Sequence, residues 1–297
     1  MTDHWRITED LDEFLTRAGG FLRSRPALHT VLLTVTDGLR SRGLHIYGAG
    51  DPVFGVLERD GAVSAACFRT PPGPLVLTAL TAAEATALAA QLADRGDELP
   101  GVTGERDTAE AFAEAWARWA GAVSELHVRQ RLYRLGELTI PAPLPPGRPR
   151  VAMAKDREQL MRWFVEFAEA VGEGGGGAMQ SPGGWADARI AYGGVTFWET
   201  LDGTPVSMAG VTAKVAGQIR VAPVYTPADL RGRGYAGAVT AEVSRVARAA
   251  GAEEVLLFTD LANPTSNALY QRIGYRPVED FAGYDFRSAS ASTPSPR

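Results

Sequence analysis

Six consecutive residues in the second half of the chain have the composition of an anion-binding loop, namely Arg231, Gly232, Arg233, Gly234, Tyr235 and Ala236. The glycines allow a tight backbone turn close to a ligand, and the arginines add permanent charge with donors suited to phosphate. The residues after the loop predict a helix over 235–250, whose unpaired amides and positive dipole end point into the same space. The spacing therefore predicts a phosphate site, although so short a pattern also fits a basic surface turn.

The strand before this loop is predicted to be irregular. Over residues 218–226, apolar side chains alternate regularly through Val221 and then resume at Val224, a slip of one residue that is typical of a β-bulge. Pro223 has no backbone N–H and cannot donate to a neighbouring strand. We expect pairing to fail here on at least one side, which leaves backbone groups of Val224 and Thr226 free to pair with an extended ligand.

The helix after the loop leads into an apolar strand at residues 254–260. Its centre, Val255-Leu256-Leu257-Phe258, shows no polar alternation, which is typical of a parallel strand covered on both faces. Strand, helix and strand follow one another within about 45 residues and predict a right-handed parallel crossover.

Taken in order, these motifs resemble the coenzyme A-binding half of the GNAT superfamily of N-acetyltransferases. The motifs are Val224-Tyr225-Thr226-Pro227, Arg231 to Ala236, the strand ending Leu257-Phe258-Thr259-Asp260, and Asn263-Pro264 through Tyr270 to Ile273-Gly274-Tyr275-Arg276-Pro277-Val278. The resemblance is detailed over residues 222–286 and looser over 151–286. It implies a mixed α/β sheet and acetyl-CoA as cosubstrate.

The resemblance also implies roles for individual residues. The loop from Arg231 to Ala236 would hold the pyrophosphate of acetyl-CoA, and the parted strands would take its pantetheine arm. Val224 would offer its amide to the thioester carbonyl, and Tyr270 would lie near the sulfur as a proton donor. Asn263 would contact the pantetheine or brace the parted strands. Because a thiolate is already a fair leaving group, positioning should dominate the chemistry.

Structural alternatives stay open for several of these residues. Tyr270 is equally explained as a packed helix tyrosine, and Asn263 before Pro264 is equally a helix cap. Tyr225 is interpreted as a wall of the cleft. The general base is not identified by the sequence, which offers three acidic candidates, Glu173, Glu199 and Asp260.

A proline-rich segment divides the chain, with five prolines between Pro141 and Pro149. We therefore expect an accessory α/β domain at 1–140, a linker at 141–150, an acetyltransferase domain at 151–286 and a disordered tail at 287–297. The first half predicts a helix at 11–22, a strand at 31–35, a hairpin at 53–68, a strand at 75–80, helices at 82–92 and 108–122, and a strand at 126–135. It lacks the Arg/Gly loop, and its order of elements is compatible with a degenerate GNAT-like half of a tandem protein.

The overall composition is that of an ordinary globular protein, with 45% hydrophobic and 22% charged residues. With a net charge of -5, the protein as a whole has no positive electrostatic potential that would attract nucleic acid. The single cysteine, Cys67, excludes an internal disulfide, and its apolar neighbours indicate a core thiol. The histidines show no metal-ligand spacing, and no secretory signal or membrane-spanning run is evident, so we expect a cytoplasmic location and no metal.

From these observations we expect transfer of an acetyl group from acetyl-CoA directly to an amine of a small acceptor. Two other functions remain open at this point: a non-catalytic coenzyme A-binding or sensor module, and an aminoacyl-tRNA-dependent transferase. We expect no membrane or nucleic-acid partner, and a homodimer is compatible with the sequence.

Overall fold

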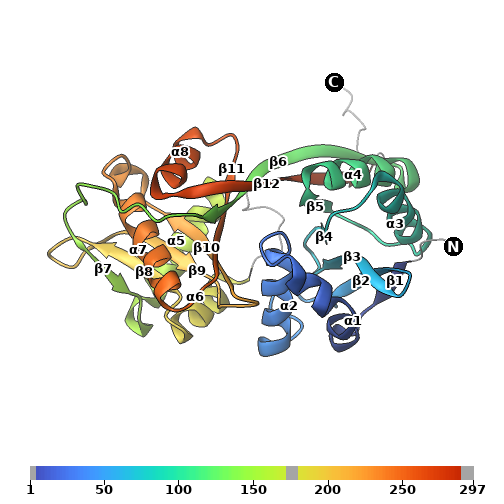
Figure 1. Ribbon diagram of the computed structural model, residues 1–297, viewed down its shortest axis with the longest axis horizontal. Coiled ribbons are helices and arrows are strands. Elements are labelled where there is room, and N and C mark those ends of the chain that lie inside the picture. The colour runs from blue at the N-terminus through green and yellow to red at the C-terminus, as the bar shows by residue number, and fades with distance from the viewer. Residues whose placement is uncertain (1–4, 172–179, 289–297) are drawn as a thin grey trace, which may run out of the picture. The chain divides into compact units, whose positions relative to one another are not determined.

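The computed structural model describes residues 5–171 and 180–288 of the 297-residue chain (Figure 1). The chain divides into two compact units. The N-terminal unit holds residues 1–130 together with 279–297, and the C-terminal unit holds 131–278. No helix in the described part of the chain is both long and apolar enough to cross a membrane.

The two halves of the sequence repeat one order of elements, apart from two short 3₁₀ turns in the second half. The first half runs β1 (Trp5–Thr8), α1 (Leu11–Ser24), α2 (Thr30–Arg42), β2 (Val53–Arg59), β3 (Ala62–Arg69), β4 (Leu75–Leu77), α3 (Ala82–Asp94), β5 (Gly101–Glu105), α4 (Arg106–Ala120) and β6 (Ala122–Leu135). The second half runs β7 (Arg148–Val151), α5 (Arg157–Ala170), α6 (Pro182–Ala191), β8 (Val195–Glu199), β9 (Pro205–Val211), β10 (Gln218–Tyr225), α7 (Tyr235–Ala249), β11 (Glu254–Asp260), α8 (Pro264–Ile273) and β12 (Tyr275–Ser288). The 3₁₀ turns are Ala154–Asp156 and Ala228–Leu230.

The last strands of the two halves are exchanged. Within the N-terminal unit the strand order is β1-β2-β3-β4-β5 followed by β12, and within the C-terminal unit it is β7-β8-β9-β10-β11 followed by β6. The β5–β12 pairing runs from Glu105 opposite Phe281 to Gly101 opposite Asp285. Each unit therefore completes its sheet with a strand from the other half of the sequence.

This exchange places the division of the chain differently from the sequence-based expectation. The boundaries between units fall inside β6, after residue 130, and inside β12, after residue 278. The proline-rich segment at 141–150 lies within the C-terminal unit. The predicted tail also begins too early, because Arg287 and Ser288 still belong to β12 and Arg287 Nη2 lies 3.0 Å from Glu125 Oε2.

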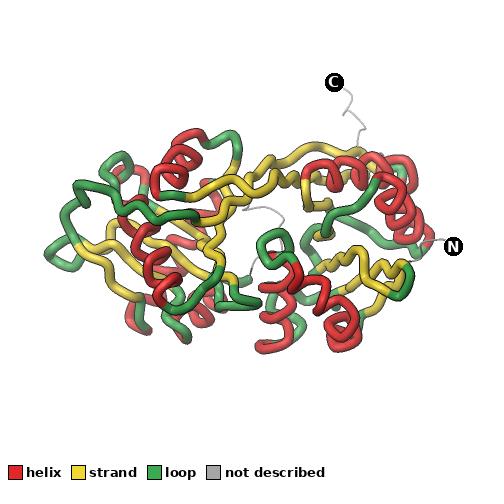
Figure 2. The backbone as a smooth tube through the Cα atoms, in the orientation of Figure 1, coloured by secondary structure: helices red, strands yellow, loops and turns green. Residues whose placement is uncertain are grey.

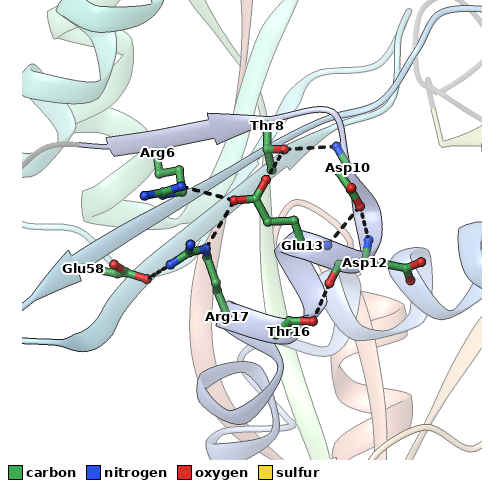
Figure 3. A network of polar contacts seen from close by, with 8 residues as sticks. All are labelled: Arg6, Thr8, Asp10, Asp12, Glu13, Thr16, Arg17 and Glu58. Atoms are coloured by element: carbon green, nitrogen blue, oxygen red, sulfur yellow. Dashed lines mark hydrogen bonds and ion pairs between the residues drawn. The ribbon is translucent and has the colours of Figure 1, made fainter.

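A network of polar contacts positions the first helix of the N-terminal unit (Figure 3). The side chain of Asp10 accepts hydrogen bonds from the backbone amides of residues 12 and 13 and so caps α1. Glu13 then accepts from Thr8 Oγ1 at 2.8 Å and from Arg17, and Arg17 Nη1 donates to Glu58 of β2 at 3.0 Å. The start of α1 is thereby tied to the edge of the sheet.

One predicted strand of the first half is wrong. Residues 31–35 are β-branched and apolar, yet they lie in α2. The buried positions Leu32, Leu33, Thr36 and Leu39 recur at helical spacing over a longer stretch than the predicted strand. The predicted core thiol is confirmed, because Cys67 is buried and its burial raises the pKa of the thiol to about 12.

The C-terminal unit packs helices on both faces of its sheet (Figures 1 and 2). The α7 side chains pack with Ala209 and Val221 in one apolar cluster, and the α5 side chains pack with Met208 and Tyr225 in another. Adjacent strand residues point to opposite faces, so α7 and α5 cover the two sides of β9 and β10. Leu160, Trp163 and Phe164 are buried and share the face of α5 that packs on the sheet.

Candidate functional site

The strands β10 and β11 part at the predicted position. Their parallel pairing covers only Gln218 to Arg220 opposite Glu254 to Leu256, although β10 continues to Tyr225 and β11 to Asp260. On its other side, β10 shows a register shift against β9 between Val221 and Val224. The predicted bulge and the predicted loss of pairing are therefore both present, and Val224 and Tyr225 lie in the part of β10 that is not paired with β11. We call the space between the parted ends of β10 and β11 the wedge.

The glycine loop leads from β10 into α7 in a geometry suited to an anion. Gly232 and Gly234 have φ values of +77° and +84°, which L side chains rarely adopt. Gly234 is the N-cap of α7, and no side chain caps this helix start. A methyl group added at Gly232 would meet nothing within 4 Å. The first amides of α7 and its positive dipole end are thus available to an anion.

The two arginines of the loop also hold it in shape. Arg231 Nε donates to the carbonyl of Thr226 at 3.0 Å, and Arg233 Nη2 donates to the carbonyl of Asp229 at 3.0 Å. A guanidinium has five N–H donors, so each arginine keeps further donors for a ligand. Thr226 is buried, and its hydroxyl lies 2.8 Å from that of Ser207. The end of β10 is therefore fixed on both sides before the loop begins.

The proline-rich segment lies along the start of α7. A methyl group added at Gly234 would lie 3.8 Å from the ring of Pro145, and one added at Gly237 would lie 3.7 Å from Pro141. Trp198 Nε1 of β8 donates to the carbonyl of Pro146 at 3.3 Å and holds the segment there. The segment thus forms part of the surroundings of the loop, a role that its composition did not predict.

Tyr270 lies near the C-terminal end of α8, where its ring is buried. It belongs to an extended apolar cluster, and Val224 and Tyr235 pack against other parts of the same cluster or against Tyr270 itself, so the three predicted site residues share one core. Its ring packs edge-on against Tyr275 with a centroid distance of 6.1 Å. Burial raises the pKa of the Tyr270 hydroxyl to about 12. The hydroxyl therefore stays protonated at neutral pH, as a proton donor requires.

Asn263 acts as a helix cap in the structure, and its neighbour Asn267 braces the wedge. Asn263 Oδ1 accepts from the amide of residue 266 at 3.0 Å. Asn267 Nδ2 donates to the carbonyl of Asp260 at 2.7 Å, and Asn267 Oδ1 accepts from the hydroxyl of Tyr133 at 2.9 Å. Asn267 was not among the predicted site residues, although its spacing of four from Asn263 places both on one face of α8.

Two of the three acidic candidates for the general base are engaged elsewhere. Glu199 is buried and accepts from Arg150 Nε at 2.5 Å, and Arg150 also contacts Asp156 with both terminal nitrogens. Asp260 Oδ1 accepts from the amide of residue 262 at 2.8 Å. The third candidate, Glu173, lies outside the described residues.

A further acidic residue, which the sequence pattern did not single out, is hydrogen-bonded to the residue next to Val224. Glu166 of α5 accepts a hydrogen bond from the hydroxyl of Tyr225 at 2.8 Å. The available signal was the position of Glu166 beside Trp163 and Phe167, where a charged residue interrupts an apolar helix face.

The N-terminal unit has a counterpart to this site that is closed by its own side chains. Its β4 and β5 form a parallel pair joined by α3, as β10 and β11 are joined by α7. The start of α3 carries a full capping box, in which Thr81 accepts from the amide of Glu84 and Glu84 accepts from the amide of Thr81 at 2.7 Å. Arg59 donates to the same carboxylate at 2.9 Å. The start of α3 is thus capped by side chains of the chain itself, and one of them is a carboxylate.

Comparisons with known proteins agree with this arrangement. Residues 158–275 match the model of the acetyltransferase (GNAT) family. A solved GCN5-related N-acetyltransferase from Sphaerobacter thermophilus is 17% identical with a TM-score of 0.59, covering 96% of each chain. A GNAT-family acetyltransferase from Colwellia psychrerythraea is 13% identical with a TM-score of 0.56, covering 96% of this chain and all of that one.

A tandem GNAT protein from the clavulanic acid biosynthesis pathway is similar over both halves. It is 14% identical with a TM-score of 0.55, covering 98% of this chain and all of that one. At sequence identities this low, the similarity shows only a shared fold. That fold is the GNAT fold in a tandem arrangement. No curated protein sequence matches the chain.

Proposed function

Residues 158–275 of this chain belong to the acetyltransferase (GNAT) family, and from this premise we propose that the C-terminal unit binds acetyl-CoA and transfers its acetyl group directly to an amine of a small acceptor. The observation that carries the proposal is the uncapped start of α7 beside parted strands. Both features are needed: the helix start suits a pyrophosphate, and the unpaired stretch of β10 suits an extended amide-containing arm.

Different residues around the wedge would bind the cosubstrate and assist the transfer of its acetyl group. The amides that follow Gly234, with Arg231 and Arg233, would bind the phosphates. The Val224 amide would polarise the thioester carbonyl, and such donors are worth most where water is excluded. Tyr270 would supply a proton to the departing sulfur. The acceptor amine then attacks the carbonyl carbon, so that a C–N bond forms while the C–S bond breaks.

The experiment that tests this function is a pair of substitutions in the loop. The double variant Arg231→Ala, Gly234→Asp removes one cation and places a carboxylate among the first amides of α7. We expect the KM for acetyl-CoA to rise far more than the KM for the acceptor, because only phosphate binding is altered. Equal effects on both constants would place the nucleotide elsewhere.

A matched control lies at the other end of the same helix. The double variant Arg245→Ala, Gly251→Asp makes the same change of charge, and Gly251 also has a positive φ, of +76°. Its KM for acetyl-CoA should stay near that of the wild type. Binding of coenzyme A without acetylation of any amine in a broad panel would instead favour the sensor function, and retention on RNA with steep salt dependence would favour the tRNA-dependent one.

A further inference from the structure

A hydrogen-bonded pair joins α5 to β10 immediately beside the wedge. Tyr225 follows Val224 in the part of β10 that is paired with β9 but not with β11, and its hydroxyl donates to Glu166 Oε2 at 2.8 Å. The ring of Trp163 lies 5.9 Å from that of Tyr225 and fills the space behind it. A single tyrosine side chain therefore separates the predicted acyl position from a carboxylate.

The second oxygen of Glu166 is not used by the fold. Among residues 5–171 and 180–288, no donor contacts Glu166 Oε1, whereas the carboxylates of Glu199 and Asp156 are held by Arg150. Glu166 is half-buried and lines a shallow, open groove that is formed by residues of α5 and by Pro182. One carboxylate oxygen is thus fixed in direction by Tyr225, while the other is available to a ligand that donates.

Within residues 5–171 and 180–288, no cation is paired with the Glu166 carboxylate. Arg162 and Glu169 of α5 line the same groove, as does Arg157, which is paired with Asp187 of α6 at 2.6 Å. Arg162 donates to Gln159. From the segment after β10, Asp229 and Arg231 act on Tyr225 with opposite signs. Burial, followed by the bond to Glu166, raises the pKa of Tyr225 to about 12, so this hydroxyl remains a donor at neutral pH.

We propose that Glu166, positioned by Tyr225, receives the proton of the attacking amine, and that the acceptor is an aliphatic primary amine, which arrives as an ammonium ion. This inference rests on the proposed function. The ammonium proton passes to Glu166, the nitrogen lone pair forms the C–N bond with the thioester carbon, and the C–S bond breaks. The leaving thiolate takes a proton from Tyr270. The nitrogen loses a second proton as the amide forms, and this proton restores Tyr270 through solvent. Glu166 then gives up the proton that it received, so that one proton is released to solvent for each acetyl group transferred.

The test compares amines of different basicity as acceptors for the full-length chain. The probes are aliphatic mono- and diamines, which are protonated at neutral pH, and anilines, which are not. A positioned base contributes about 10²- to 10⁴-fold, so Glu166→Gln should lower kcat/KM for aliphatic amines by that factor. For anilines the loss should stay below about tenfold, because they arrive unprotonated and the proton that their nitrogen loses after attack is acidic enough for water to accept. The KM for acetyl-CoA should not change.

Two further variants separate this role from a structural one. Glu169→Gln makes the same change one helical turn away in the same groove and should leave both acceptor classes unaffected. Tyr225→Phe keeps the carboxylate but removes the bond that orients it, and it should lower kcat/KM for aliphatic amines by about tenfold. Unchanged coenzyme A affinity would show that each variant is folded.

The outcomes distinguish this inference from the proposed function. Equal losses for aliphatic amines and anilines in Glu166→Gln would overturn the role of Glu166 as a proton acceptor. Full activity of Glu166→Gln, together with a raised acetyl-CoA KM in the loop variant, would overturn the inference while supporting the acetyltransferase function. A wild-type chain that binds coenzyme A but acetylates neither class would overturn both.

Discussion

The Tyr270 hydroxyl shows how burial limits what one residue can contribute. Its pKa of about 12 lies above the ordinary value near 10, and both lie above that of a free thiol, about 8.5. Proton transfer from this hydroxyl to a thiolate is therefore uphill, and the group can help only as the charge on sulfur develops. Positioning by the wedge remains the larger effect.

Tyr270→Phe is accordingly expected to lower kcat by only about tenfold, which is less than the usual effect of a general acid or base, without changing coenzyme A affinity. Because the folded pKa is raised, the Tyr270 hydroxyl stays protonated until the pH approaches 12. Any change of kcat between pH 8 and 10 therefore comes from other groups, and it should be the same in the wild type and the variant. Steady-state kinetics across this pH range measure both effects. An unaltered kcat would assign Tyr270 to packing.

The neighbouring Tyr275 provides a control for that substitution. It is fully buried, and its hydroxyl lies 2.7 Å from that of Ser244. Tyr275→Phe should cost about 1 kcal/mol of unfolding free energy and leave kcat unchanged, because it removes a hydrogen bond within the core. A denaturant titration beside the kinetic assay tests this contrast.

At the scale of elements, the two halves share the strand–helix–strand plan and differ in how the helix starts. The start of α7 has no side-chain cap, whereas α3 begins with the capping box of Thr81 and Glu84. A helix start that already holds a carboxylate has few free amides and repels a second anion. The same architecture therefore offers a phosphate site in one unit and closes it in the other.

We expect one molecule of coenzyme A to bind per chain, at the C-terminal unit. Isothermal titration calorimetry should give a stoichiometry near one for wild type, and the Arg231→Ala, Gly234→Asp variant should show strongly weakened binding. Glu84→Ala should keep a stoichiometry of one and lower stability by about 1 kcal/mol through loss of its cap. Two equivalent sites in wild type would show that α3 also binds the nucleotide.

At the scale of the whole molecule, the exchange of β6 and β12 makes each unit depend on both halves of the sequence. In the C-terminal unit β6 pairs with β11, and its Tyr133 is hydrogen-bonded to Asn267, which braces the wedge. Without β6 the apolar strand β11 would present an unpaired edge, which favours aggregation.

A fragment of residues 151–286, the domain suggested by the proline-rich boundary, should therefore fail to fold alone. We expect low soluble yield and no coenzyme A binding, and we expect co-expression with residues 1–150 to restore both. Soluble yield and calorimetric titration of the purified samples are the measurements. A monomeric fragment with the affinity of the intact chain would show that β6 is dispensable.

By itself, the sequence determined the features that depend on consecutive residues. The bulge near Pro223, the glycine loop and the buried strand β11 were predicted correctly, because backbone conformation and apolar period are set locally. Only the tertiary structure decided which distant groups meet: Glu166 with Tyr225 across 59 residues, Tyr133 with Asn267 across 134, and Glu199 with Arg150. The exchanged strands belong to the same class. The sequences of β6 and β12 would each allow pairing with either β5 or β11. Which pairing forms depends on contacts between residues that are far apart in the sequence.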